Sequence, residues 1–119
     1  AVSSDGGLVN SVSQWCAYKD VIGRERMNAG VPWSQSKIWR EQNPFTYANQ
    51  FRTPMLVTVG ELDYRVPVNN SIENWHILQR QKIPSKLIVF PEENHWVLKA
   101  ENSRFFYQEL HSWLETYLK

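Results

Sequence analysis

The sequence is poor in the features that hold together small secreted domains or that span membranes. Cys16 is the single cysteine, which excludes an internal disulfide framework and any zinc site built from several cysteines. No apolar run approaches the roughly 18 residues that a membrane-spanning helix needs. Residues 1–7 have neither the basic region nor the apolar core of a signal peptide. We therefore expect no membrane partner, and the compartment, cytoplasm or periplasm, stays open.

Neither sign of charge dominates. Thirteen Lys and Arg residues stand against twelve Asp and Glu residues, for a formal net charge of +1, and neither sign is collected into a run. Nucleic-acid-binding domains gather Lys and Arg into a basic patch, so we expect no nucleic-acid partner. No pair of histidines has metal-binding helical spacing, and Gly6-Gly7 is far from a phosphate-binding G-x-G-x-x-G loop. We therefore expect no metal and no cofactor.

What is present is the composition of one globular domain. The chain has 119 residues, of which 42% are hydrophobic and 13% aromatic, with six tryptophans. This length allows a single domain with a modest core. The chain does not begin with methionine, and its opening residues resemble the end of a strand. We therefore expect it to start inside a domain.

Two short apolar runs, residues 55–60 and 86–90, predict buried strands. Their residues are nearly all apolar instead of alternating, which is typical of parallel strands covered on both faces. Between them, Pro67 suits the start of a helix, and apolar residues recur at helical spacing up to about Gln81. A strand, a helix and a second strand in this order form a right-handed crossover. The sequence predicts an α/β fold, a mostly parallel sheet flanked by helices.

The rest of the sequence gives weaker predictions of secondary structure, except at its C-terminal end. Residues 1–4 predict a strand end, followed by a turn at Asp5-Gly6-Gly7. From residue 8 to 43 the pattern is weak, with one short helical face made by Trp15, Tyr18, Val21 and Ile22, and a second short helix over 36–42. Pro44 suits the start of a further helical segment. The clearest helix spans Asn102–Lys119, with Asn102 or Ser103 able to cap its start.

Ionisable residues follow both predicted strands. Asp63 comes three residues after Gly60, and His95 comes five residues after Phe90. The carboxyl ends of parallel strands meet at one edge of a sheet, so we expect these side chains to lie close together. A carboxylate bound to one imidazole nitrogen orients the ring and stabilises the imidazolium that forms when the other nitrogen takes a proton. The pair is half of a device that activates a nucleophile.

Other interpretations of these residues stay open. An aspartate in a loop commonly binds nearby backbone N–H groups, and a loop histidine is commonly solvated. Glu92 or Glu93 is an alternative partner for His95. Arg65 fits an ion pair with Asp63 better than a substrate clamp. His76 and His111 lie in predicted helices, where a histidine is usually solvated or hydrogen-bonded. Trp33 and Trp39 lie in the irregular region and are candidates for a pocket wall.

The motifs around both strands resemble one enzyme family. The stretches are Thr53-Pro54-Met55-Leu56-Val57, Gly60-Glu61-Leu62-Asp63-Tyr64-Arg65-Val66-Pro67 and Phe90-Pro91-Glu92-Glu93-Asn94-His95-Trp96. They are similar to the C-terminal part of the α/β-hydrolase catalytic domain in the prolyl oligopeptidase family of serine peptidases, in its dipeptidyl-peptidase and acylaminoacyl-peptidase branch. This resemblance implies that Asp63 is the triad acid and His95 the triad base. It also implies short peptide substrates, because an N-terminal β-propeller restricts access in this family.

One feature of that family is missing from the sequence. Its nucleophile lies in a G-x-S-x-G turn, and no serine here has glycines two residues before and two after it. We therefore interpret residues 1–119 as a partial catalytic domain without the nucleophile elbow and the propeller, inactive alone. We expect an exposed sheet edge to pair with the missing part or with a second copy. An esterase or thioesterase fragment and a noncatalytic assembly module remain alternatives.

Overall fold

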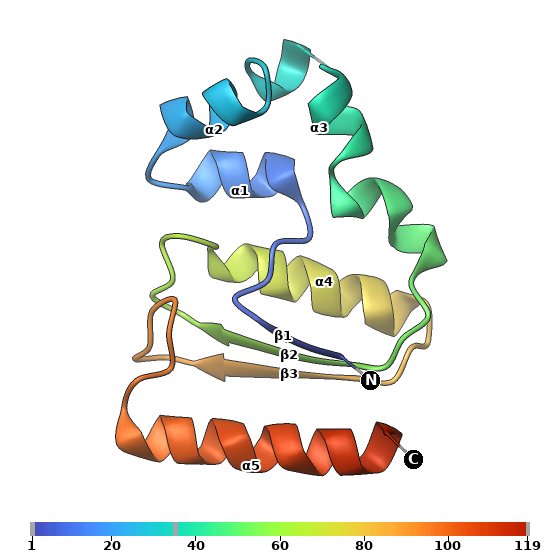
Figure 1. The fold of residues 1–119 in the computed structure, drawn as a ribbon, viewed down its shortest axis with the longest axis vertical. Coiled ribbons are helices and arrows are strands. Elements are labelled where there is room, and N and C mark those ends of the chain that lie inside the picture. The colour runs from blue at the N-terminus through green and yellow to red at the C-terminus, as the bar shows by residue number, and fades with distance from the viewer. Residues whose placement is uncertain (1, 35, 119) are drawn as a thin grey trace.

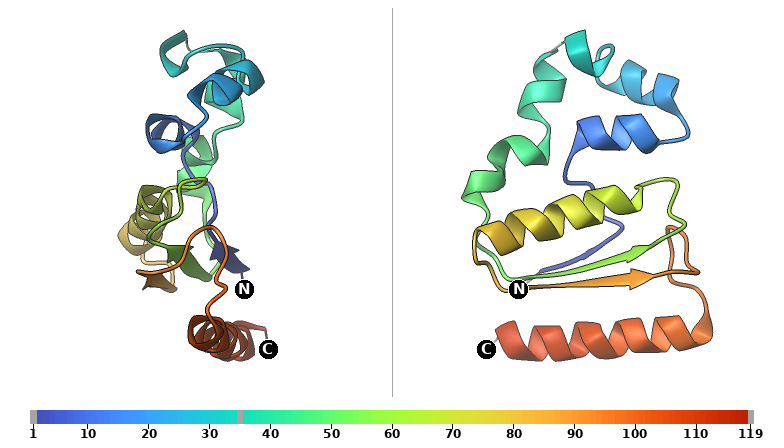
Figure 2. Two further views of the ribbon diagram at one scale, coloured as in Figure 1. Left: turned by 90° about the vertical axis from the view of Figure 1, so that its left-hand side faces the viewer. Right: turned by 180° about the vertical axis from the view of Figure 1, so that it is seen from behind.

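The computed structural model describes residues 2–34 and 36–118. Its centre is a sheet of three parallel strands, β1 (Val2–Asp5), β2 (Met55–Gly60) and β3 (Ser85–Phe90), in the order β1-β2-β3. Helix α4 (Val68–Arg80) covers one face of the sheet and helix α5 (Ala100–Tyr117) the other (Figures 1 and 2). The predicted α/β class, with a parallel sheet between helices, is confirmed.

Strand β2 is the centre of the core. Leu56, Val57, Thr58 and Val59 are fully buried, as expected for a strand with a neighbour on each side and a helix on each face. Val57 packs in one cluster with Leu78 of α4 and with Ile83. Each buried aliphatic side chain of this kind contributes about 1.5–3 kcal/mol. The strand therefore holds the turn at its carboxyl end in a fixed place.

Between β1 and β2 the chain forms a layer of short helices beyond α4 (Figure 1). It contains the helices α1 (Ser11–Ala17), α2 (Val21–Met27) and α3 (Lys37–Glu41), and the 3₁₀ segments η1 (Pro32–Ser34) and η2 (Pro44–Gln50). Helix α3 confirms the short helix expected over 36–42. Within the described residues, none of the helices is both long and apolar enough to cross a membrane.

The single helical face expected from Trp15 to Ile22 is wrong. Helix α1 ends before Tyr18, whose backbone is extended, and Asp20 begins a new helix by accepting a hydrogen bond from the Gly23 N–H at 2.9 Å. Aspartate before a helix satisfies one of the N–H groups that lack a partner in the first turn. That local capping signal outweighs a weak apolar periodicity.

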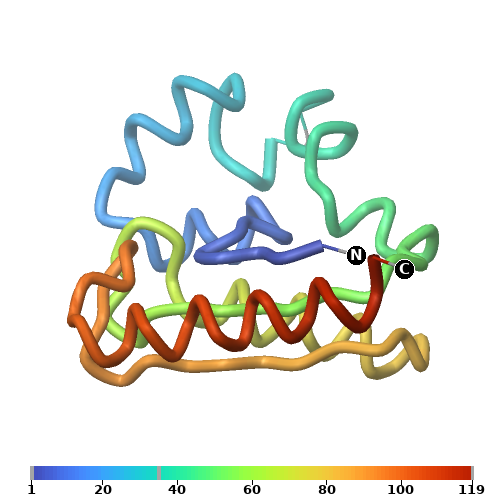
Figure 3. Tube along the Cα trace, turned by 60° about the horizontal axis from the view of Figure 1, so that its bottom comes forward, coloured from blue at the N-terminus to red at the C-terminus, as the bar shows by residue number. Residues whose placement is uncertain are grey.

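The expected cap of α5 is also wrong. The helix begins at Ala100, before Asn102 and Ser103. Among the described residues no side chain caps its first turn, and the Glu93 carboxylate instead accepts hydrogen bonds from the backbone N–H groups of Leu98 and Lys99, just before the helix. Figure 3 shows α5 running along the sheet, where Phe105 packs edge-on against Phe90 of β3. Ala1 and Lys119, which the sequence placed in the first strand and the last helix, lie outside the described residues.

Candidate active site

Asp63 lies in the turn that follows β2. Its side chain is fully buried, and its Oδ1 atom accepts hydrogen bonds from the backbone N–H groups of Arg65 and Val66, both at 2.8 Å. The turn is closed by the Asp63 N–H, which donates to the Gly60 carbonyl at 3.1 Å. These contacts are those of an aspartate that shapes a turn. They use one carboxylate oxygen and leave Oδ2 to face the next loop.

His95 lies in the loop that follows β3 and meets that free oxygen. The distance between His95 Nδ1 and Asp63 Oδ2 is 2.8 Å. The imidazole is 25% exposed, whereas the carboxylate is fully buried. An ionised carboxylate only accepts hydrogen bonds, so it places the proton of a neutral imidazole on Nδ1. The second nitrogen, Nε2, then carries a free electron pair that can accept a proton.

The two loops are joined directly. The Glu61 N–H donates to the Phe90 carbonyl at 2.9 Å, and the Leu62 N–H donates to the Glu93 carbonyl at 3.0 Å. At Gly60 a Cβ atom would lie 2.1 Å from the Asn94 carbonyl oxygen, so only glycine allows this approach. The carboxyl ends of β2 and β3 thus form one rigid unit that sets the distance between Asp63 and His95.

A second acidic residue lies close to the pair. Asp5, at the end of β1, accepts a hydrogen bond from the Thr58 hydroxyl at 2.7 Å. Partial burial raises the pKa of the Asp5 carboxyl above its ordinary value, while the Thr58 hydrogen bond and the neighbouring His95 oppose this shift. The next residue, Gly6, has a φ of +52°, and a Cβ atom there would lie 3.1 Å from Asp63 Oδ2. The end of β1 therefore forms one wall of the site.

A cavity of about 430 Å³ opens beside His95. Besides the two loops, its lining includes Tyr18 and Lys19, from the break between α1 and α2. Trp96 also lines it, 59% exposed and edge-on to the His95 ring. A substrate group held there would lie next to the imidazole. Sequence reasoning missed Tyr18 and Lys19 as lining residues, because the weak periodicity of that segment hid the helix break that presents them.

The other candidates from the sequence lie elsewhere or act differently. Glu93 is buried but points toward α5, and Glu92 is exposed beside Lys99. Arg65 contacts Asp63 through its backbone N–H. His76 and His111 are exposed on helices. Trp33 and Trp39 do not line the cavity beside His95. Trp39 is instead buried, and its indole N–H donates to the Gly30 carbonyl at 2.8 Å.

The site offers no donor set for a metal ion. Among residues 2–34 and 36–118, no three His, Cys, Asp or Glu side chains come together in a group that could hold one. The arrangement can accept and return a proton at His95 Nε2. The buried Asp63 carboxylate would stabilise the positive charge that forms on the imidazole.

Comparison with curated proteins gives several relatives named dipeptidyl-peptidase 5. Dipeptidyl-peptidase 5 of Schizosaccharomyces pombe is 40% identical over 113 residues, which are 95% of this chain and 16% of that protein. Dipeptidyl-peptidase 5 of Aspergillus fumigatus is 33% identical over 118 residues, which are 98% of this chain and again 16% of the relative. The chain thus spans about a sixth of the length of these relatives.

Solved structures show the same fold. Acylaminoacyl peptidase of Pyrococcus horikoshii superimposes with a TM-score of 0.87 at 18% identity, covering 98% of this chain and 20% of that one. Dipeptidyl peptidase 4 of Porphyromonas gingivalis gives a TM-score of 0.76 at 18% identity, covering 98% and 15%. The sequence profile of the prolyl oligopeptidase family matches residues 4–119. The resemblance drawn from the motifs is confirmed, and the chain belongs to the prolyl oligopeptidase family of serine peptidases.

Proposed function

We propose that Asp63 and His95 are the acid and the base of a Ser-His-Asp triad. The observation that carries the proposal is the 2.8 Å contact between His95 Nδ1 and the buried Asp63 carboxylate. In this mechanism His95 Nε2 takes the proton of the serine hydroxyl as it attacks a carbonyl carbon, and later gives that proton to the leaving group. Asp63 keeps the imidazole in the required tautomer and stabilises the imidazolium.

The nucleophile is proposed to come from a segment outside residues 1–119. No serine of this chain lies in a G-x-S-x-G turn, which is the turn that exposes a nucleophilic serine in α/β-hydrolases. We further propose that residues 1–119 are the C-terminal part of the catalytic domain and do not hydrolyse peptides alone. The relatives, of which the chain covers only 16%, leave ample length for such a segment and for a propeller.

The proposed substrates are short peptides or acyl-peptides. Support comes from the names of the relatives, dipeptidyl-peptidase 5 and acylaminoacyl peptidase. The cavity beside His95 has a size suited to one or two side chains. Its wall carries the aromatic rings of Tyr18, Tyr64 and Trp96 together with Lys19, so apolar groups and a negative charge would both find partners there.

The same reasoning gives a partner for the sheet. Strand β1 pairs with β2 on one side, and within the described residues no strand pairs with its other side. An open strand edge offers unpaired N–H and C=O groups to another chain. We propose that this edge pairs with a strand of the rest of the enzyme, or with a second copy when residues 1–119 are alone.

A fluorophosphonate probe tests the proposal, because it reacts only with an activated serine. The intact protein should be labelled, and His95→Gln should slow labelling by about 10³-fold or more. His76→Gln, which changes an exposed histidine of α4, is the matched control and should label like the parent. A parent that resists the probe would favour the noncatalytic alternative. A labelled parent that cleaves esters and no peptides would favour the esterase alternative.

A further inference from the structure

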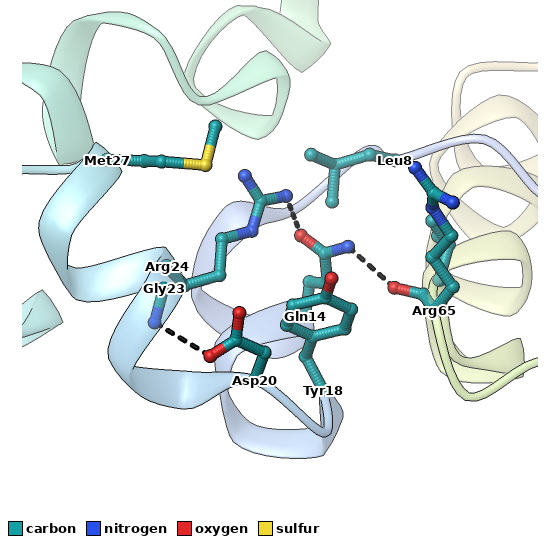
Figure 4. Close-up of a pocket in the computed structure, with 9 residues that line it drawn as sticks. Leu8, Gln14, Tyr18, Asp20, Gly23, Arg24, Met27 and Arg65 are labelled. Atoms are coloured by element: carbon teal, nitrogen blue, oxygen red, sulfur yellow. Dashed lines mark hydrogen bonds between the residues drawn. The ribbon is translucent and has the colours of Figure 1, made fainter.

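The side chain of Gln14, in α1, connects two elements that are far apart in the sequence. It is 4% exposed, and its Nε2 atom donates to the Arg65 carbonyl at 2.9 Å, across 51 residues of chain. Its Oε1 atom accepts a hydrogen bond from the guanidinium of Arg24 in α2. Figure 4 shows Gln14 between the two arginines. A guanidinium only donates and a carbonyl only accepts, so these partners allow a single orientation of the amide.

The peptide group that Gln14 holds also binds the carboxylate of the proposed triad. The Arg65 carbonyl and the Val66 N–H belong to the same peptide group, and the Val66 N–H donates to Asp63 Oδ1 at 2.8 Å. The structure describes no cis peptide bond, and in a trans peptide group the C=O and N–H point in opposite directions. Gln14 and Asp63 therefore bind the two ends of one peptide group.

These contacts form a continuous series of hydrogen bonds. It runs from Arg24 to Gln14, through the Arg65–Val66 peptide group to Asp63, and on to His95 Nδ1. Hydrogen bonds in series polarise one another when they are shielded from water. Donation to the Arg65 carbonyl makes the Val66 N–H a stronger donor. It also prevents the peptide group from turning away from Asp63.

We propose that Gln14 is a positioning residue for the triad, which holds the Asp63 carboxylate toward His95 by fixing the Arg65–Val66 peptide group. The inference rests on the proposed function of Asp63 and His95. Gln14 touches neither of them, so its effect passes through the backbone of the turn. It also ties α1, which is anchored elsewhere by Asn10 and Asn43, to the acid-bearing turn.

The test uses the intact protein and two readouts. The first is the strongly deshielded proton resonance of His95 Nδ1–H, whose position reports the hydrogen bond to Asp63. The second is the rate of labelling by a small fluorophosphonate, which does not depend on binding of a peptide. Gln14→Met keeps the length and helix preference of the side chain and removes its polar atoms. We expect the resonance to move upfield and broaden, and labelling to slow about tenfold.

The chain offers a matched control at another glutamine. The Gln81 amide donates to the Ala48 carbonyl at 2.7 Å and accepts from Arg52 at 3.4 Å, so it has the same kinds of partners as Gln14. It follows α4, at the opposite end of that helix from the Asp63 turn. Gln81→Met should lose comparable stability without changing the His95 resonance or the labelling rate.

A second variant separates the two ends of Gln14. Gln14→Glu keeps an acceptor for Arg24 but removes the donor to the Arg65 carbonyl, so it should change the resonance as Gln14→Met does. If Gln14→Met fails to fold, Gln14→Glu provides the same test. A parental resonance and a labelling rate within twofold of the parent in either folded variant would overturn the proposal. If the parent shows the His95 resonance but is not labelled, the proposed function is rejected. The change of that resonance in the Gln14 variants would still decide whether Gln14 positions Asp63.

Discussion

At the scale of single residues, the proposed role of Asp63 depends on its charge. Asp63→Asn keeps the shape of the side chain, and its amide oxygen can still accept from the turn. Its amide nitrogen, however, is a donor facing His95 Nδ1 and favours the wrong tautomer of the imidazole. We expect kcat of the intact enzyme to fall about 10⁴-fold, measured on a dipeptidyl or acyl-peptide substrate. Activity within tenfold of the parent would remove Asp63 from the triad.

A matched control for that substitution is Asp20→Asn. Asp20 is exposed and caps α2 by accepting from the Gly23 N–H. An asparagine caps a helix nearly as well as an aspartate. The variant should therefore keep both the stability and the kcat of the parent.

The lack of a side chain at Gly6 leaves room for both members of the pair. A Cβ atom there would lie 3.1 Å from Asp63 Oδ2 and 3.2 Å from His95 Nδ1, and its φ of +52° disfavours other residues. Gly6→Ala should lower the free energy of unfolding by about 1–2 kcal/mol and slow fluorophosphonate labelling about tenfold, because the methyl group pushes the pair apart. Denaturant unfolding and labelling rates measure the two effects.

Gly30→Ala separates strain from contact. Gly30 also has a positive φ, of +113°, but a Cβ atom there would lie 3.5 Å from its nearest neighbour, Ser34 Oγ. We expect it to lose stability without slowing the labelling of the folded protein. Equal slowing in both alanine variants would mean that Gly6 acts through stability alone.

The sequence predicted the members of the candidate pair but not their surroundings. Asp63 and His95 were found because each follows a continuous apolar run, and parallel strands bring such positions together. Gly6 was assigned to a turn without being placed beside the pair, and the roles of Gln14 and Tyr18 were missed because both come from a segment with weak periodicity. The positions of Gly6 and Gln14 depend on contacts across more than 50 residues, namely the bonds from Gly6 to Thr58 and from Gln14 to Arg65. No local pattern encodes such contacts.

At the scale of elements, Glu93 links the start of α5 to the loop that carries His95. Hydrogen bonds from the Asn102 amide and from the N–H groups of Leu98 and Lys99 hold the pKa of Glu93 below its ordinary value, against an opposing effect of burial. A lowered pKa in the folded state means that the charged carboxylate stabilises the fold. That contribution is present above the ordinary glutamate range and is lost as pH falls through the lowered pKa.

The pH dependence of unfolding tests this role. The Tm of the parent should fall on acidification below the ordinary glutamate range. Glu93→Gln should have a lower Tm than the parent at neutral pH, and the difference between the two should shrink as the pH falls. Glu92→Gln changes the exposed neighbour that pairs with Lys99 and should follow the parent. A constant difference between the parent and Glu93→Gln across this range would show that charge is not what Glu93 contributes.

The start of α5 was mispredicted for a physical reason. A search for a helix cap looks at the residue directly before the first turn, which is Lys99 here and makes no side-chain cap. The start of the helix is instead held from the preceding loop, where the Glu93 carboxylate accepts hydrogen bonds from the N–H groups of Leu98 and Lys99 and from the Asn102 amide. Strands β2 and β3 were predicted nearly to the residue from their uninterrupted apolar runs. The expected burial holds for β2 alone, because Lys86 and Val89 of β3 are exposed at the edge of the sheet.

At the scale of the molecule, we propose that the open edge of β1 governs how residues 1–119 associate. The Val2 N–H donates to the carbonyl of Pro54, just before β2, and the Gly6 N–H to that of Thr58. In a parallel ladder the N–H groups of Ser3 and Asp5 therefore point to the outer edge. Proline at position 3 would remove an outward donor while leaving the pairing with β2 intact. We expect residues 1–119 to associate with concentration in sedimentation velocity, and Ser3→Pro to shift them toward the monomer.

The other edge of the sheet provides the comparison. Register with β2 directs the Val89 N–H outward from β3, so Val89→Pro blocks that edge in the same way. If β1 is the edge that recruits a strand, Val89→Pro should associate like the parent, and only Ser3→Pro should weaken association. The reverse result would assign association to β3, and a monodisperse parent monomer at every concentration would show that neither edge recruits a partner. In the intact enzyme the β1 edge should already be paired, so Ser3→Pro there should lower stability and leave the oligomeric state unchanged.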